Sequence, residues 1–186
     1  MRNFKNDQSG RSMVEMLGVL AIIGVLSVAG IAGYSKAMAK YKLSKTTDQV
    51  SMLVANIRTL YSGQRNYAGL DSSKAISFGV VPNEMVIDKD TISNAYAGSV
   101  TIDAADPSGG IANGAFKVQF NGLGRDTCIA LATSDWGSGS SSGLIKMTIG
   151  ANEYEGANLP VTLDNAVSNG SCECDSTSCS VAWTYL

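Results

Sequence analysis

The chain has 186 residues, enough for one domain with its own hydrophobic core and a separate membrane anchor. Its formal net charge is −2, from 14 basic and 16 acidic side chains, so it lacks the basic footprint of a nucleic-acid-binding protein. It contains no histidine, the commonest general base and metal ligand, which argues against an enzyme and against a resident cofactor.

The first predicted element is a long apolar segment near the N-terminus. Residues 11–34 form an apolar run whose only charged side chains are Glu15 and the flanking Arg11, and they follow a short polar leader that ends at Gly10. Twenty residues of this segment would span about 30 Å as a helix, the thickness of a bilayer's hydrocarbon core. A charge inside such a segment is costly and normally has a partner and a function.

Two ordinary interpretations of this segment compete. A secretory signal peptide could end at the small residues near Ala29–Gly33, but its apolar region is typically about 7–15 residues, shorter than this one. A simple transmembrane anchor would fit the length. Neither interpretation explains why Gly10 and Glu15 stand five positions apart at the start of the segment.

The predicted helix continues beyond the apolar segment. No proline occurs between residues 11 and 61, and after Tyr34 the apolar positions become one-sided with the i, i+3, i+4, i+7 spacing. We therefore expect residues 35–61 to be an amphipathic continuation that packs on the domain. The expected buried positions are Val50, Leu53, Val54, Ile57, Leu60 and Tyr61.

The remaining residues, 62–186, are rich in turn-forming residues up to about Pro107, and the sheet candidates come later. Alternating apolar and polar positions predict strands at Phe116–Phe120, Leu144–Ile149 and Val181–Tyr185. Short helices are expected at Arg125–Thr133 and at Leu163–Asn169, the latter capped by Thr162 and stopped by Gly170. The expected class is α+β, with a long helix against an antiparallel sheet.

Three patterns in this region resemble functional sites. Gly139–Gly143 matches G-x-S-x-G, but the chain has no histidine to act as its base. The pairs Asp103/Asp106 and Glu153/Glu155 lack calcium-loop spacing, so we interpret them as acidic residues of solvated loops. Trp136 and Trp183 are interpreted as core or subunit-contact residues.

All four cysteines lie beyond the apolar segment, at Cys128, Cys172, Cys174 and Cys179. An even number in an exported domain predicts two disulfides and an oxidising compartment, although four thiolates could instead bind zinc. Three pairings exist, and the one containing Cys172–Cys174 is disfavoured because its ring would be strained.

The N-terminal residues resemble a known processing signal. Gly10-Arg11-Ser12-Met13-Val14-Glu15 and the apolar run are similar to the prepilin signature of type IV pilins and type II secretion pseudopilins. The resemblance implies that a prepilin peptidase cuts between Gly10 and Arg11 and methylates the new amine. It also implies that Glu15 is the carboxylate that directs assembly. Arg11 stands where this family usually has Phe or Met.

Later segments resemble one branch of that family, the type IVb pilins such as the bundle-forming pilin. These segments are Leu60–Gln64, Tyr67–Ser72, Val81-Pro82 and Cys128–Thr133. The resemblance implies the type IV pilin fold and a Cys128–Cys172 disulfide, which leaves Cys174 to pair with Cys179.

The family resemblance divides the chain into a leader (1–10), a transmembrane and assembly helix (11–34), its amphipathic continuation (35–61) and a head domain (62–186). It implies a major pilin that waits in the inner membrane and then polymerises into an extracellular fibre for adhesion, aggregation or conjugation. Its partners would be its own copies, the prepilin peptidase and the inner-membrane assembly machinery. The alternatives are a type II secretion pseudopilin and a membrane-anchored periplasmic enzyme or binding protein.

Overall fold

The computed structural model describes residues 13–137, 142–168, 170–174 and 179–186. The chain divides into two compact units, residues 1–41 and 42–186. In chain order, the elements are α1 (Met13–Tyr61), α2 (Ser72–Ser77), η1 (Asn83–Met85), β1 (Ile92–Ser93), β2 (Ser99–Ala105), β3 (Ala115–Leu123), α3 (Arg125–Thr133), β4 (Leu144–Ile149), β5 (Asn152–Glu155), η2 (Gly156–Asn158), α4 (Leu163–Ala166) and β6 (Cys179–Tyr185).

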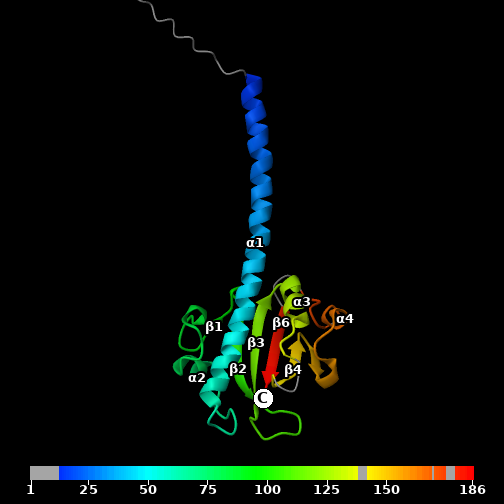
Figure 1. Cartoon of the computed structure of the whole chain (residues 1–186). Coiled ribbons are helices and arrows are strands. Elements are labelled where there is room, and N and C mark those ends of the chain that lie inside the picture. Colours follow the sequence, from blue (N-terminus) through cyan, green and yellow to red (C-terminus); the bar gives the residue numbers. More distant parts are fainter. Residues whose placement is uncertain (1–12, 138–141, 169, 175–178) are drawn as a thin grey trace, which may run out of the picture. The chain divides into compact units, whose positions relative to one another are not determined.

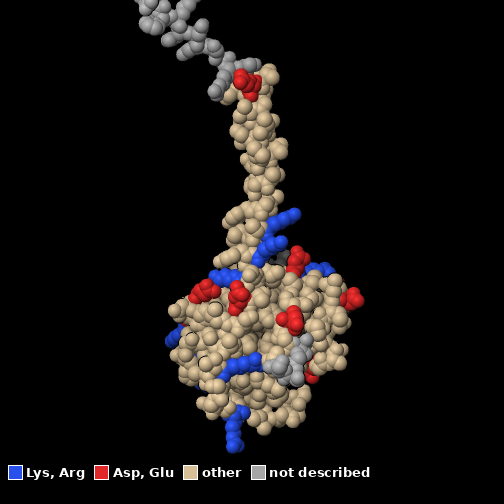
Figure 2. Space-filling view, in the orientation of Figure 1, with Lys and Arg blue, Asp and Glu red and all other residues tan. Residues whose placement is uncertain are grey.

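The first unit consists, in its described part, of the N-terminal portion of α1. Every residue from 13 to 37 is exposed, including the large apolar side chains on all sides of the helix. The surface of this stretch is uncharged except near its two ends (Figure 2). By length and composition, α1 is able to cross a membrane.

In the second unit, α1 continues as an amphipathic helix, as its spacing predicts. Val50, Leu53 and Ile57 are fully buried, and Val54 is nearly so. The prediction is wrong for Leu60, which is 42% exposed. Leu60 lies at the last turn of the helix, beside a shallow surface hollow that Phe78 also lines, so the domain does not cover it.

A six-stranded antiparallel sheet forms the body of the second unit, in the order β1-β2-β3-β6-β4-β5 (Figure 1). The C-terminal strand β6 lies in the middle of the sheet and pairs with both β3 and β4. Trp183, for example, is opposite Val118 on one side and Met147 on the other. β6, the last strand in the chain, therefore joins the β1-β2-β3 part of the sheet to the β4-β5 hairpin.

Alternation along the strands separates the two faces of the sheet. In β3, Phe116, Val118 and Phe120 are fully buried, whereas the intervening Lys117 and Gln119 are only half-buried. The helix and the apolar face enclose the core, where the rings of Trp136 and Trp183 meet edge to face with centroids 4.9 Å apart. Trp183 is thus a core residue, as one of the two predictions for it states, whereas Trp136 is half-buried and packs against the core.

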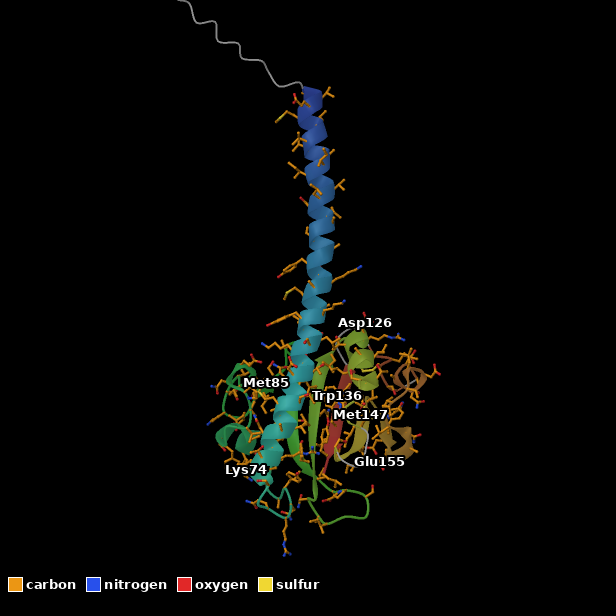
Figure 3. All side chains as sticks on the ribbon, in the orientation of Figure 1. Lys74, Met85, Asp126, Trp136, Met147 and Glu155 are labelled. Atoms are coloured by element: carbon orange, nitrogen blue, oxygen red, sulfur yellow. A yellow bond between two sulfur atoms is a disulfide. The ribbon has the colours of Figure 1, made fainter. Side chains whose placement is uncertain are left out.

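Buried methionines and exposed charges follow the same division (Figure 3). Met85 and Met147 are 0% and 1% exposed and lie in the core, whereas Lys74, Asp126 and Glu155 lie at the surface. The core of this domain is therefore assembled from short elements as well as from the strands and α1.

Three expectations need correction. Three strands, β1, β2 and β5, lie where turns or loops were expected. The helix α4 ends at Ala166 and not at Asn169, so Gly170 is not its stop, although Thr162 does cap it by accepting a hydrogen bond from the Asn165 N–H. Gly170 instead lies in a turn, with a φ of +86°. Its carbonyl oxygen accepts a hydrogen bond from the Ala151 N–H at 2.7 Å.

Candidate functional site

Glu15 lies in the first turn of α1 and is exposed. An acidic side chain is favourable at this position because the free N–H groups of the helix give its N-terminus a partial positive charge. Glu15 is surrounded by exposed apolar residues, with Val14 75% and Leu17 63% exposed. It is the only acidic residue between Met13 and Tyr41.

If this apolar surface becomes buried, the Glu15 carboxylate loses its contact with water. An ionised carboxylate that loses water needs a hydrogen-bonding cation to compensate it. No such cation contacts Glu15 within the described part of the chain, so a partner must come from the leader-proximal residues or from another molecule. Gly10 and Arg11, the predicted cleavage pair, lie outside the described residues, so processing remains a prediction.

The structure links Cys128 to Cys172 by a disulfide with a Cα–Cα distance of 5.7 Å. Cys128 is on the buried face of α3, and both cysteines are 0% exposed. The linked residues are 44 positions apart, and the segment between them contains β4, β5 and α4. This disulfide therefore connects helix α3 to the segment that follows α4.

A second disulfide links Cys174 to Cys179, with a Cα–Cα distance of 5.4 Å across five positions. Cys179 is the first residue of β6 and is 1% exposed. The cross-link thus lies directly at the start of the central strand, and residues 175–178 between the two cysteines are outside the described part.

A hydrogen-bonded cluster around Tyr154 supports the disulfide-bridged region. The Tyr154 hydroxyl donates to the Asn165 carbonyl oxygen at 2.9 Å and lies 2.8 Å from the Ser171 hydroxyl. The Asn152 side-chain amide also donates to the Ser171 hydroxyl, at 2.9 Å. These contacts connect β5, α4 and the residue before Cys172, and no spacing in the sequence indicates them.

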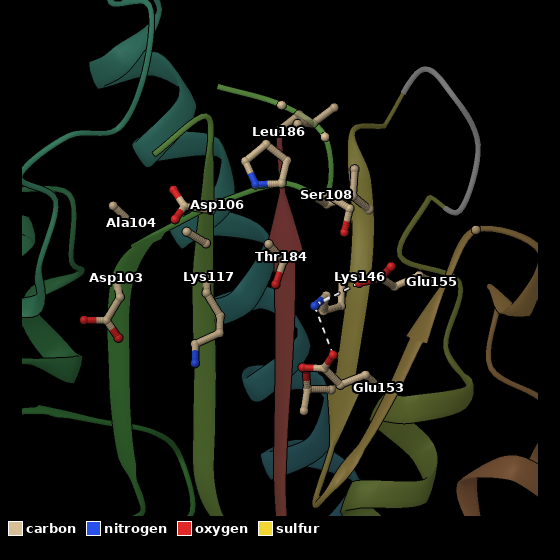
Figure 4. Close-up of a pocket in the computed structure, with 17 residues that line it drawn as sticks. Asp103, Ala104, Asp106, Ser108, Lys117, Lys146, Glu153, Glu155, Thr184 and Leu186 are labelled. Carbon is tan, nitrogen blue, oxygen red and sulfur yellow. Dashed lines mark hydrogen bonds and ion pairs between the residues drawn. The ribbon is translucent and has the colours of Figure 1, made fainter. Parts of the chain in front are cut away.

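The second face of the sheet carries a row of polar residues across five strands (Figure 4). Register places Asp103 opposite Lys117, Lys117 opposite Thr184, Thr184 opposite Lys146 and Lys146 opposite Glu155. The row forms the floor of an open groove of about 910 Å³, beside the segment that follows β2.

Ion pairs occupy one end of this groove. The Lys146 Nζ lies 3.0 Å from a Glu153 carboxylate oxygen and 2.8 Å from one of Glu155. The two glutamates raise the pKa of Lys146, most strongly through the hydrogen bond that its ammonium group donates to Glu155. The expectation that the acidic pairs belong to solvated loops is therefore wrong for Asp103, Glu153 and Glu155, which are strand residues because cross-strand pairing holds their backbones.

Among the described residues, no three His, Cys, Asp or Glu side chains come together as a metal site. Most of the G-x-S-x-G match lies outside the described residues, and its final Gly143 lies directly before β4.

Comparison with known proteins identifies this combination of long helix, antiparallel sheet and bridged C-terminal region. A family model described as "PilS N terminal" matches residues 40–186. The chain therefore belongs to the PilS family, and its long helix and antiparallel sheet are the type IV pilin fold.

Solved structures support the fold. A crystal structure of the type IVb pilin from Salmonella typhi aligns with a TM-score of 0.57 at 20% identity, covering 78% of this chain and 98% of that one. TcpA, a type IV pilin from the Vibrio cholerae El Tor biotype, aligns with a TM-score of 0.54 at 15% identity, covering 78% and 99%. No curated protein sequence matches the chain.

Proposed function

We propose that this protein is the major subunit of a type IVb pilus and that it polymerises through α1 into an extracellular fibre. Before assembly, the subunit is anchored in the inner membrane by the apolar part of α1, with the disulfide-bonded head on the oxidising side. The leader is removed by a prepilin peptidase after Gly10. Membership of the PilS family and the type IV pilin fold support this proposal.

The observation that carries the proposal is the all-round apolar surface of α1 from Met13 to Ser35, with Glu15 as its one acid. Such a helix is not stable in water by itself and must be covered. Lipid covers it in the membrane, and the helices of other copies cover it in the fibre. Because the same segment meets different surfaces of its neighbours, the contact is heterologous and grows without closing into a ring.

Glu15 then sets the axial register between subunits. In the packed helices its carboxylate accepts hydrogen bonds from the terminal amine that cleavage creates on Arg11 of a neighbouring subunit. A free α-amino group has an ordinary pKa of about 7.7–8.0, so this amine is largely charged at neutral pH. The Arg11 guanidinium can add a second donor. A subunit without the carboxylate would leave this amine uncompensated.

The test is Glu15→Ala in cells that carry the pilus assembly machinery. The variant should insert in the membrane and be cleaved, yet produce few or no fibres in electron micrographs of sheared material. Asp48→Ala is the matched control, because it removes one exposed carboxylate from the amphipathic part of the same helix. Normal fibre number and length in Glu15→Ala would refute the proposal that Glu15 directs assembly.

A further inference from the structure

The C-terminal end of the first unit carries two lysines and two tyrosines within eight positions. Tyr34 and Tyr41 are 68% and 59% exposed, and Lys36 and Lys40 are also exposed. The twenty residues between Glu15 and Lys36 contain no charged side chain. The first basic residues after the apolar segment therefore lie between Tyr34, which ends that segment, and Tyr41.

The position of these four residues along α1 matches the thickness of a membrane. Lys36 lies 21 positions after Glu15, which is about 31 Å along a helix that rises 1.5 Å per residue. The hydrocarbon core of a bilayer is about 30 Å thick. If Glu15 is at one boundary of the core, Lys36 is at the other boundary.

The four side chains point in two separate directions from one half of the helix. At about 100° per residue, Tyr34 and Tyr41 lie about 20° apart around the axis, and Lys36 and Lys40 lie about 40° apart. The centres of the two pairs differ by about 130°. Together they cover an arc of about 160° of the helix, with the tyrosines at one edge of the arc and the lysines at the other.

The chain leaves the two ammonium groups free to bind a ligand. Lys42 and Lys45, the next two lysines, are used by the head domain: Lys42 lies over the Tyr96 ring and Lys45 pairs with Glu84 at 3.1 Å. Lys36 and Lys40 make no hydrogen bond or ion pair with the residues that the structure describes. An ammonium group at a membrane boundary has lipid phosphate as its nearest abundant anion.

We propose that Tyr34, Lys36, Lys40 and Tyr41 form a lipid-interface anchor that binds the phosphate of anionic phospholipids in the leaflet nearest the head domain. The lysine stems lie along the acyl chains while their ammonium groups reach the phosphates, and the tyrosine rings lie at the headgroup level. The anchor fixes the depth of the subunit in the membrane, and its contacts must break when the subunit is extracted. This inference rests on the proposed membrane-bound state of the unassembled subunit.

The experiment measures lipid selectivity in the full-length chain before assembly. The protein is reconstituted in vesicles of phosphatidylcholine and phosphatidylglycerol, and electron paramagnetic resonance compares spin-labelled forms of the two lipids for association with it. The expected result is a preference for phosphatidylglycerol that falls about fivefold for each lysine replaced in Lys36→Gln/Lys40→Gln. Lys36→Arg/Lys40→Arg should retain the preference, and high salt should weaken it.

The matched control is Arg65→Gln/Lys89→Gln, which removes two exposed positive charges from the head domain and should leave the preference unchanged. Equal association of the two lipids, or the same preference in Lys36→Gln/Lys40→Gln as in the natural chain, would overturn the anchor. Failure of the protein to restrict either lipid would instead refute the membrane-bound state on which the proposed function depends. Glu15→Ala should keep the lipid preference even where it forms no fibres.

Discussion

At the scale of single residues, Gly10 is the position that separates a prepilin from a secreted protein. The Gly10-to-Glu15 spacing predicts that co-expression with a prepilin peptidase shortens the chain by ten residues. Gly10→Val should block this cleavage because a branched side chain replaces the smallest residue at the cut. Intact-mass spectrometry of the membrane fraction measures both forms. A mature terminus near Gly33 in the natural chain would restore the signal-peptide interpretation.

Arg58 connects the amphipathic part of α1 to the C-terminus. Its guanidinium donates to the carbonyl oxygens of Ser142 at 2.6 Å and Leu186 at 3.2 Å, and it lies over the Tyr185 ring at 4.9 Å. Gly143, with a φ of +71°, lies so close that a Cβ there would collide with this guanidinium. Contacts with the residue before β4 and with the residues at the end of β6 therefore hold the Arg58 guanidinium in place.

We expect Arg58→Met to lower the free energy of unfolding by about 2–3 kcal/mol, because it keeps the alkyl stem but loses two charge-assisted hydrogen bonds and the cation–π contact. Arg58→Lys should lose less, since it keeps the charge without the planar fork. Urea unfolding of the full chain in detergent, followed by tryptophan fluorescence, measures the change. Arg65→Met, on an exposed loop, is the control, and equal stability of both Met variants would contradict a role for Arg58.

At the scale of elements, the two disulfides should differ in their contribution to stability. Loop-closure entropy assigns about 4 kcal/mol to a bridge across 44 positions and about 2 kcal/mol to one across five. Replacing both cysteines of a pair by alanine avoids a leftover thiol. Cys128→Ala/Cys172→Ala should therefore destabilise the protein more than Cys174→Ala/Cys179→Ala.

Chemical denaturation of the two double variants tests this order, and peptide mapping of the natural chain tests the pairing itself. Mapping should find Cys128 joined to Cys172 and Cys174 joined to Cys179, with no free thiol in assembled fibres. A Cys128–Cys174 link would overturn the pairing while leaving the fold in place. Four reactive thiols or bound zinc would remove the disulfides altogether.

The elements that the sequence predicted share a strong local signal. The spacing of Val50, Leu53, Val54 and Ile57 identified the buried face of α1, and alternation identified β3, β4 and β6. The strand β2 does alternate, with Val100 and Ile102 buried, but the signal is brief and lies within a turn-rich segment. No periodicity could reveal β5, because three of its four residues are polar and pairing with β4 makes it a strand.

In the candidate site, only residues whose role follows from their neighbours in the sequence could be predicted. Glu15 stands out because a lone carboxylate in an apolar helix has few explanations. The cluster of Asn152, Tyr154 and Ser171 depends on segments that folding brings together, as do the contacts of Arg58. Ordinary polar residues at unremarkable spacings carry no sign of such contacts before the sheet order is known.

At the scale of the whole molecule, the head domain depends on its last strand. β6 separates β3 from β4, so the sheet cannot be completed until the C-terminal residues are present. Both disulfides use cysteines close to β6: Cys172 pairs with Cys128 of α3, and Cys174 pairs with Cys179. Arg58 also donates a hydrogen bond to a backbone oxygen of Leu186. The features that stabilise this domain are concentrated around the end of the chain, which makes the stability sensitive to the ionisation of groups there.

Tyr185, the last residue of β6, predicts a loss of stability at alkaline pH. Burial raises its pKa to about 12, although Arg58 opposes the shift. An unfolded tyrosine titrates near pH 10, so the unfolded state releases its proton first and the stability falls between about pH 10 and pH 12. Below pH 10 this contribution is fully present, and its loss amounts to at most about 3 kcal/mol.

Lys146, whose pKa is raised by its glutamates, also loses its ion pairs as the pH rises. Tyr185→Phe keeps the ring stacked on Phe116 and should flatten the fall in denaturation experiments from about pH 9 to pH 12. An unchanged slope in Tyr185→Phe would show that another group causes the alkaline loss.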